Sequence, residues 1–231
     1  GGSATVHFPI WHQEIEDIIV LKNNKGSEDN RVRKLDYSIQ LSKLFYERFI
    51  NNADITLFSP HEVPELYDAW GSSEFDDLYE KAERKLSVKK TKINAQELFF
   101  DILKERAETG RIYIMNIDHC NTHSSFKDKV YMSNLCQEIT LPTTPIQHID
   151  DKEGEIALCI LSAINLGLLT DIDELEELCD LSVRALDEII DYQEYPVEAA
   201  KISTQARRSL GIGYIGLAHY LAKNQVSYEH K

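Results

Sequence analysis

The chain has 231 residues, of which 42% are hydrophobic and 28% charged, as is usual for a globular protein with a sizeable core. No apolar run reaches the length of a membrane span and no signal peptide opens the chain, so we expect reduced cysteines and a cytoplasmic location. The formal net charge of −14 argues against a nucleic-acid backbone as a partner, although a few local donors could hold a small anion.

The two ends of the chain suggest a piece of a longer protein. It starts with Gly1 and Gly2 in place of Met, and it ends at Lys231 in a polar stretch. We therefore expect further segments on both sides.

The first half of the chain alternates short apolar runs with longer amphipathic ones. Period-two patterns and β-branched runs predict strands at 4–10, 35–41, 55–58 and 111–117. Periods near 3.6 predict helices at 11–22, 45–51 and 94–109 and a helical hairpin over 63–84. Polar loops are expected at 23–30 and 119–129, and a basic connector at 85–92.

Two helix starts carry capping signals. Ser59 followed by Pro60 favours a helix that begins at the proline. Asn94 is the expected N-cap of the helix that Gly110 should stop.

The second half continues the alternation of strands and helices. We expect a buried strand at 155–164 that contains Cys159, and helices at 171–192, 196–209 and 216–224. Asp171 or Asp173 would cap the first of these helices. Short strands alternating with helices predict an α/β fold with mainly parallel strands.

Residues 131–142 (YMSNLCQEITLP) contain a chemically suggestive spacing. Asn134, Cys136 and Glu138 lie at i, i+2 and i+4, so on extended backbone an amide, a thiol and a carboxylate would share one face. Ile139 and Pro142 favour the extended conformation. The alternative is an edge strand with a buried cysteine and two solvated polar residues.

A glycine motif further along also needs weighing. Residues 211–216 match G-x-G-x-x-G, a pattern found in dinucleotide-binding turns between a strand and a helix. The preceding residues read as the end of a helix, which favours a tightly packed turn between two helices.

The remaining candidates are cysteines and histidines. His119, Cys120 and His123 have a spacing that can ligate zinc, or they belong to a self-satisfied polar loop. Cys136 and Cys159 could meet in one cavity or be two core residues, whereas Cys179 reads as core.

Several segments together resemble a known family. SNLCQEITLP is similar to the finger-loop motif in the large, catalytic subunit of class I (aerobic) ribonucleotide reductases of bacterial and bacteriophage type. NRVRKLDYSIQ, DITLFSP, GRIYIMNIDHCNTHS, GEIALCILSAINLG and RRSLGIGYIGLAHYLAK look like the same subunit, in the same order. The resemblance covers essentially the whole chain.

The resemblance implies a fold. The family has a ten-stranded α/β barrel made of two five-stranded halves, with the finger loop through its centre. Residues 1–231 would be a single partial domain, the central part of that barrel with its finger loop and surrounding helices. The N-terminal and C-terminal portions would be absent.

The resemblance also implies roles for individual residues. Cys136 would carry the thiyl radical, Asn134 and Glu138 would contact the substrate beside it, and Cys159 would be one of two redox-active cysteines. The second redox cysteine would precede Gly1. Gly1 and Gly2 would end the loop that relays effector identity.

Cofactors and partners follow from the same resemblance. No metal or cofactor is expected on this chain, because a metal-containing small subunit would supply the radical and absent parts would bind most of the ATP or dNTP effectors. Expected partners are that small subunit, a second large subunit, thioredoxin or glutaredoxin, and a nucleoside diphosphate, but neither nucleic acid nor membrane. The alternatives are another barrel-type radical reductase, or a non-catalytic zinc or interaction module built on His119, Cys120 and His123.

Overall fold

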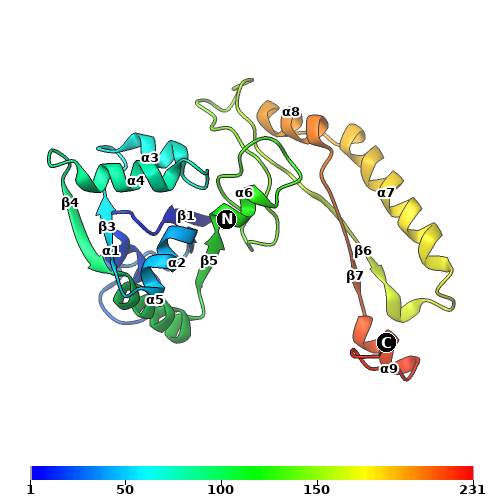
Figure 1. Cartoon of the computed structure of the whole chain (residues 1–231). Helices are drawn as coiled ribbons and strands as arrows, with labels where there is room; N and C mark the ends of the chain where they lie inside the picture. Colours follow the sequence, from blue (N-terminus) through cyan, green and yellow to red (C-terminus); the bar gives the residue numbers. More distant parts are fainter. Residues whose placement is uncertain (1, 231) are drawn as a thin grey trace. The chain divides into compact units, whose positions relative to one another are not determined.

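The computed structural model describes residues 2–230, which form two compact units divided between Pro142 and Thr143. Figure 1 shows the elements of each unit. The single partial domain expected over residues 1–231 stays a prediction.

A parallel three-stranded sheet organises the first unit. Its strands are β1 (Thr5–Pro9), β2 (Asp36–Leu41) and β5 (Ile112–Asn116), in the order β1-β2-β5. Phe8 pairs with Ile39, which pairs with Ile114, and both pairings are parallel. The predicted strands and their parallel direction are confirmed here.

A second, antiparallel pair joins β3 (Asp54–Phe58) to β4 (Lys90–Asn94). The prediction of a basic connector over 85–92 was wrong at its C-terminal end, because β4 begins at Lys90. Lysine is a poor strand former, which hid the strand. In the fold Lys90 caps the end of a helix. Its ammonium group donates to the carbonyls of Glu83 and Lys85, at 2.7 and 2.6 Å.

The helices of this unit are α1 (Ile15–Ile19), α2 (Lys43–Ile50), α3 (Pro64–Ala69), α4 (Phe75–Arg84), α5 (Ala95–Thr109) and α6 (Ile117–Thr122). A 3-10 turn, η1 (Glu28–Asn30), lies in the predicted polar loop. The termini of α5 follow the prediction. Asn94 Oδ1 accepts from the amides of Gln96 and Glu97 at 2.9 and 3.2 Å, and Gly110 stops the helix with φ of 65°.

Two helix predictions and one loop prediction in this unit were wrong in extent. The helix expected at 11–22 begins only at Ile15, because Trp11 and Gln13 pair with the backbone of Phe58 at the end of β3. The helix expected to begin at Pro60 begins at Pro64, which holds Val63 outside helical geometry. Part of the loop expected at 119–129 is helix α6.

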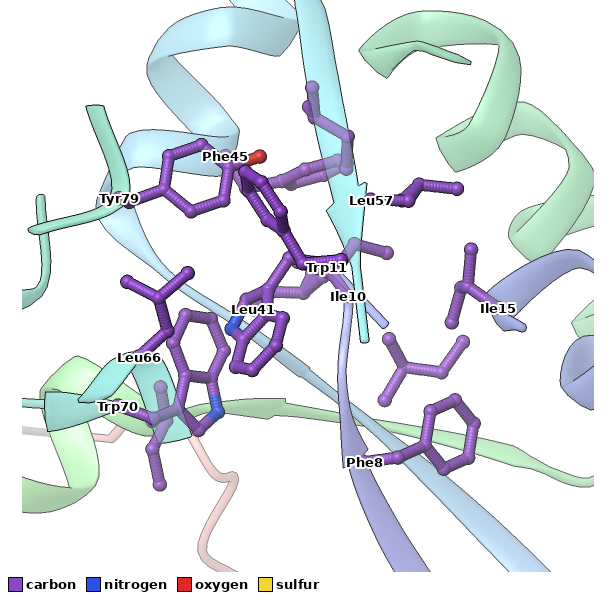
Figure 2. Close-up of a cluster of buried hydrophobic side chains, with 14 of the residues drawn as sticks. Phe8, Ile10, Trp11, Ile15, Leu41, Phe45, Leu57, Leu66, Trp70 and Tyr79 are labelled. Atoms are coloured by element: carbon purple, nitrogen blue, oxygen red, sulfur yellow. The ribbon is translucent and has the colours of Figure 1, made fainter. Parts of the chain in front are cut away.

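An aromatic core fills the first unit. Trp11, which is 1% exposed, packs edge-on against Trp70 with ring centroids 6.0 Å apart and stacks on Phe75 at 6.3 Å. Figure 2 shows Trp11 and Trp70 beside Leu41, Leu66 and other core side chains. Burying each such side chain contributes roughly 1.5–3 kcal/mol, so this core fixes the sheet on which the candidate site is built.

The second unit is built on a parallel pair, β6 (Ile160–Asn165) and β7 (Leu210–Ile215). Its helices are α7 (Glu174–Tyr192), α8 (Glu198–Arg207) and α9 (Leu217–Lys223), with a 3-10 turn η2 (Leu166–Leu168) after β6. Arg208 ties the end of α8 to α7, donating to Asp187 at 2.6 Å and to Asp191 at 3.0 Å.

Two strand predictions in this unit needed correction. The strand expected at 155–164 begins at Ile160, because Glu155 instead bridges to Thr144. The turn expected at 211–216 is mostly strand β7, since its backbone pairs with β6 over six positions from Leu210 to Ile215.

The mixed α/β fold is confirmed. Within residues 2–230 the strands form three separate sheets and do not close into a barrel. None of the helices in this range combines the length and the apolar character that a membrane crossing requires.

Candidate functional site

The stretch that carries Asn134, Cys136 and Glu138 is a tight turn. The amide of Gln137 donates to the Asn134 carbonyl at 3.1 Å, and the amide of Asn134 donates to the Ile139 carbonyl at 3.3 Å. Asn134 Oδ1 also accepts from the Ile139 amide at 3.0 Å. The predicted extended backbone was therefore wrong, because the asparagine side chain competes for backbone groups and closes a turn.

The turn presents three kinds of chemistry within five residues. Asn134, Cys136 and Glu138 are all exposed at the surface of the first unit. The amide oxygen of Asn134 is engaged in the turn, so Asn134 can offer a ligand its amide nitrogen as a donor. Cys136 offers a thiol and Glu138 a carboxylate, which can take or return a proton.

Polar side chains of the parallel sheet hold this turn. Gln40 Nε2 of β2 donates to the Tyr131 carbonyl at 2.6 Å, and Trp70 Nε1 donates to Gln40 Oε1 at 2.8 Å. Thr5 Oγ1 of β1 donates to the Leu135 carbonyl at 2.6 Å. The face of the sheet under the turn is therefore polar.

Gln137 makes the third attachment, from within the turn. Its Oε1 accepts from Ser38 Oγ of β2, and its Nε2 donates to the Ile114 carbonyl of β5, both at 2.6 Å. Every strand of the sheet thus contributes at least one group that holds the turn or the residues just before it.

His7 lies two residues after Thr5 on β1 and so on the same face of the sheet. Both of its ring nitrogens are buried, and neither forms a hydrogen bond of normal geometry in the described part of the chain. Burial lowers the pKa of His7, an effect that the neighbouring Ser133 backbone partly offsets. Burial therefore favours the neutral form of the ring beneath the turn.

Sequence reasoning missed the side chains that hold the turn. Asp36, Ser38 and Gln40 alternate with the apolar residues of β2, and from this alternation only a strand was predicted. The polar half of the same pattern was the available signal, because one face of a strand in a barrel points inward. The role of Gln137 had no sequence signal, since it depends on the turn.

Cys159 lies in the second unit, next to β6, and is half-buried. A Cβ atom at Gly211 of β7 would approach Cys159 Sγ to 3.2 Å and Leu161 Cδ2 to 2.5 Å. The glycine thus leaves room for the cysteine side chain. Whether Cys136 and Cys159 share one cavity stays a prediction, because they belong to different units.

Other predicted residues have simpler outcomes. Gly1 lies outside the described residues, and Gly2 is an exposed residue before β1. Cys179, expected in the core, is exposed on α7, which corrects that prediction.

The zinc alternative centres on α6. The rings of His119 and His123 are 5.4 Å apart, and burial raises the pKa of the Cys120 thiol. Between residues 2 and 230, no three His, Cys, Asp or Glu side chains cluster as metal ligands would.

The structure also bears on the dinucleotide-binding alternative, because the first two glycines of the motif at 211–216 lie inside strand β7. Gly211 and Gly213 pair with β6, and Gly216 alone lies at the start of α9, with φ of 73°. A phosphate-binding turn needs the first glycines after the strand, so this geometry does not match one.

Comparison with known proteins identifies the family of the chain. A family model described as the ribonucleotide reductase barrel domain matches residues 1–231. The chain belongs to this family. The resemblance seen in the sequence is thus confirmed over its whole length.

Curated relatives carry the same family name. The chain is 58% identical over 233 residues to the ribonucleoside-diphosphate reductase subunit alpha of Buchnera aphidicola subsp. Schizaphis graminum, covering 99% of this chain and 30% of that protein. It is 54% identical to the ribonucleoside-diphosphate reductase 1 subunit alpha of Escherichia coli K12 and 46% identical to the subunit alpha of Enterobacteria phage T4, covering 31% of each. The chain spans about a third of the length of the curated relatives it matches.

Proposed function

We propose that this chain is the central part of the catalytic subunit of a ribonucleoside-diphosphate reductase. That enzyme would reduce ribonucleoside diphosphates to 2′-deoxyribonucleoside diphosphates by a thiyl-radical mechanism and so supply DNA precursors. The observation that carries the proposal is the exposed turn with Cys136 between Asn134 and Glu138, fixed on the polar face of the β1-β2-β5 sheet. Family membership supports the same reaction.

The residues of the turn suit the first half of the reaction. Removing a ribose 2′-hydroxyl is difficult because hydroxide leaves poorly, and a radical at C3′ makes the neighbouring C–O bond labile. The Cys136 thiyl radical would take the hydrogen atom from C3′. Glu138 would accept the 3′-hydroxyl proton, while the cysteine pair gives a proton to the 2′-hydroxyl, which leaves as water. Asn134 would hold the ribose hydroxyls through its amide nitrogen.

A pair of cysteines would complete the reaction. Cys159 and a second cysteine outside this chain would give the substrate two electrons and two protons, one to the leaving 2′-hydroxyl and one to C2′, and become a disulfide. Glu138 would return its proton to the 3′-oxygen. Cys136 would return its hydrogen to C3′ and regain the radical. The balance is one ribonucleotide and one dithiol converted to one deoxyribonucleotide, one water and one disulfide, which thioredoxin or glutaredoxin would reduce.

The remaining parts would come from other chains and segments. A metal-containing small subunit would supply the oxidising equivalent that makes the Cys136 radical. A second large subunit would form the dimer, and ATP or dNTP effectors would bind mainly outside residues 1–231. We place the complete enzyme in the cytoplasm.

The proposal is tested by turnover in the complete subunit with its small subunit and a dithiol. Cys136→Ser keeps the size and polarity of the side chain but cannot readily form the radical, so we expect no deoxynucleotide product. Cys179→Ser is the matched control, because Cys179 is also an exposed cysteine but belongs to α7 of the other unit. It should keep wild-type turnover.

Product formation by Cys136→Ser at the wild-type rate would refute the radical role. Equal loss in both variants would point to general damage by cysteine replacement and would also count against the assignment.

A further inference from the structure

The side chain of Gln137 joins the turn to two strands at once. Ser38, which is fully buried, donates from Oγ to Gln137 Oε1, and Gln137 Nε2 donates to the Ile114 carbonyl, both at 2.6 Å. The bridge needs one acceptor and one donor on the same short side chain. A neutral amide supplies both.

The backbone of Gln137 also depends on this bridge. Its φ of +62° lies in the left-handed region, which residues with a Cβ atom rarely adopt. Such a conformation persists where surrounding contacts over-determine it, often at functional sites. The two side-chain hydrogen bonds and the amide bond to the Asn134 carbonyl are contacts of that kind.

Gln137 directly precedes Glu138 and directly follows Cys136. On the other side of the thiol, Thr5 holds the Leu135 carbonyl at 2.6 Å. Cys136 is thus the one residue between two anchors on the sheet.

We infer that Gln137 is a positioning residue that, through Ser38 and the Ile114 carbonyl, fixes where the Cys136 thiol points. The inference rests on the proposed function, because it assigns Gln137 a part in that reaction. Misplacing a reacting group by about 1 Å can cost on the order of 10²-fold in rate. Loss of the bridge should therefore slow turnover by roughly 10- to 100-fold.

The chemistry of the bridge provides a specific signature. In Gln137→Glu the ionised carboxylate could still accept from Ser38, but its second oxygen would face the Ile114 carbonyl and repel it. Protonation would convert that oxygen into a donor and restore both bonds. The variant should therefore recover toward wild type as pH falls through the pKa of its carboxyl group, whereas Gln137→Ala should not recover.

The experiment uses the complete subunit with the variants Gln137→Ala, Gln137→Glu, Ser38→Ala and the double variant Ser38→Ala, Gln137→Ala. Gln147→Ala is the matched control, because Gln147 is an exposed glutamine outside the turn. The first readout is hydrogen exchange of the peptide over 131–142, with α5 as an internal reference. The second is turnover, compared with wild type at each pH.

In Gln137→Ala we expect exchange in the turn to accelerate about tenfold, with α5 unchanged, and turnover to fall as stated above. The double variant should match Gln137→Ala alone, since both changes remove one bridge. Gln147→Ala should behave as wild type.

Three results would overturn the inference: wild-type turnover in Gln137→Ala, additive losses in the double variant, or no recovery of Gln137→Glu at low pH. These results would leave the proposed function standing if Cys136→Ser is still inactive. Turnover retained by Cys136→Ser would instead overturn the proposed function, whatever the Gln137 variants do.

Discussion

Glu138 is the exposed carboxylate that directly follows Gln137 in the turn. In the proposed reaction it takes the 3′-hydroxyl proton, and a general base typically contributes 10²- to 10⁴-fold to a rate. Glu138→Gln keeps the shape and hydrogen bonding but removes the base. We expect turnover to fall by about 10²- to 10⁴-fold in the complete subunit, measured as deoxynucleotide formed per minute. A change confined to KM, with kcat intact, would assign Glu138 to binding alone.

His7 gives the sheet under the turn a dependence on pH. Because burial lowers the pKa of His7, its ring takes up a proton less readily in the folded chain than in the unfolded chain. The contribution of the neutral His7 ring to the free energy of unfolding is full above the unfolded pKa of about 6.5. It is lost as pH falls toward the lower pKa that His7 has in the folded chain. We expect wild type to lose more stability than His7→Gln between about pH 7.5 and 5.5.

Thermal unfolding of wild type, His7→Gln and His61→Gln measures this difference. His61 is exposed, so its replacement should leave the pH dependence of wild type in place. Identical pH profiles for wild type and His7→Gln would exclude His7 as the source.

Among the elements, α5 shows what local sequence signals can fix. Asn94 and Gly110 satisfy the ends of the helix, and both were predictable because capping depends on neighbours along the chain. The alternating residues of β2 likewise predicted a strand in the right place. Where partners lie close in sequence or repeat with a regular period, prediction from sequence is sound.

The predictions were wrong where hydrogen-bond partners far away in the sequence determine the backbone conformation. Trp11 and Gln13 lie outside the helix because Phe58, more than forty positions away, pairs with them. The composition of residues 131–142 favours an extended backbone, but hydrogen bonds from Asn134 and from the polar face of the sheet stabilise a turn. The residue types of the candidate site could be predicted from the sequence. Its anchors Ser38 and Thr5 could not, because only the fold brings them to the turn.

The cap of α5 supports a prediction at the same scale. Asn94→Ala removes the acceptor for the amides of Gln96 and Glu97 and should cost about 1 kcal/mol. Hydrogen exchange of these two amides measures the effect, and they should lose protection. Asn94→Ser, which can still cap, is the control and should stay near wild type. Unchanged protection in Asn94→Ala would show that packing alone holds this helix end.

At the scale of the whole molecule, residues 1–231 correspond to about a third of their relatives. The strands described here do not close a barrel, and β1 and β4 each lie at the edge of their sheet. Uncovered strand edges and apolar side chains such as Leu161 and Tyr214, both 62% exposed, favour association. The proposed enzyme thus needs groups from beyond this stretch.

We therefore predict that residues 1–231 alone reduce no nucleotide, even with the small subunit and a dithiol supplied. They should also be poorly soluble unless the flanking segments are co-expressed. The groups of a catalytic unit act together, so the absence of one is enough to stop turnover. Size-exclusion chromatography and a product assay check both parts. A monodisperse 26.5 kDa monomer that forms deoxynucleotide would be incompatible with this prediction.

Hydrogen abstraction can be separated from the later reduction by following release of tritium from a 3′-labelled nucleoside diphosphate. In the complete enzyme, Cys159→Ser should still release label, since Cys136 acts first, but it should form no normal product. Cys136→Ser should bind the nucleotide and release none. Label released by Cys136→Ser at the rate of Cys159→Ser would contradict the assignment of the radical to Cys136.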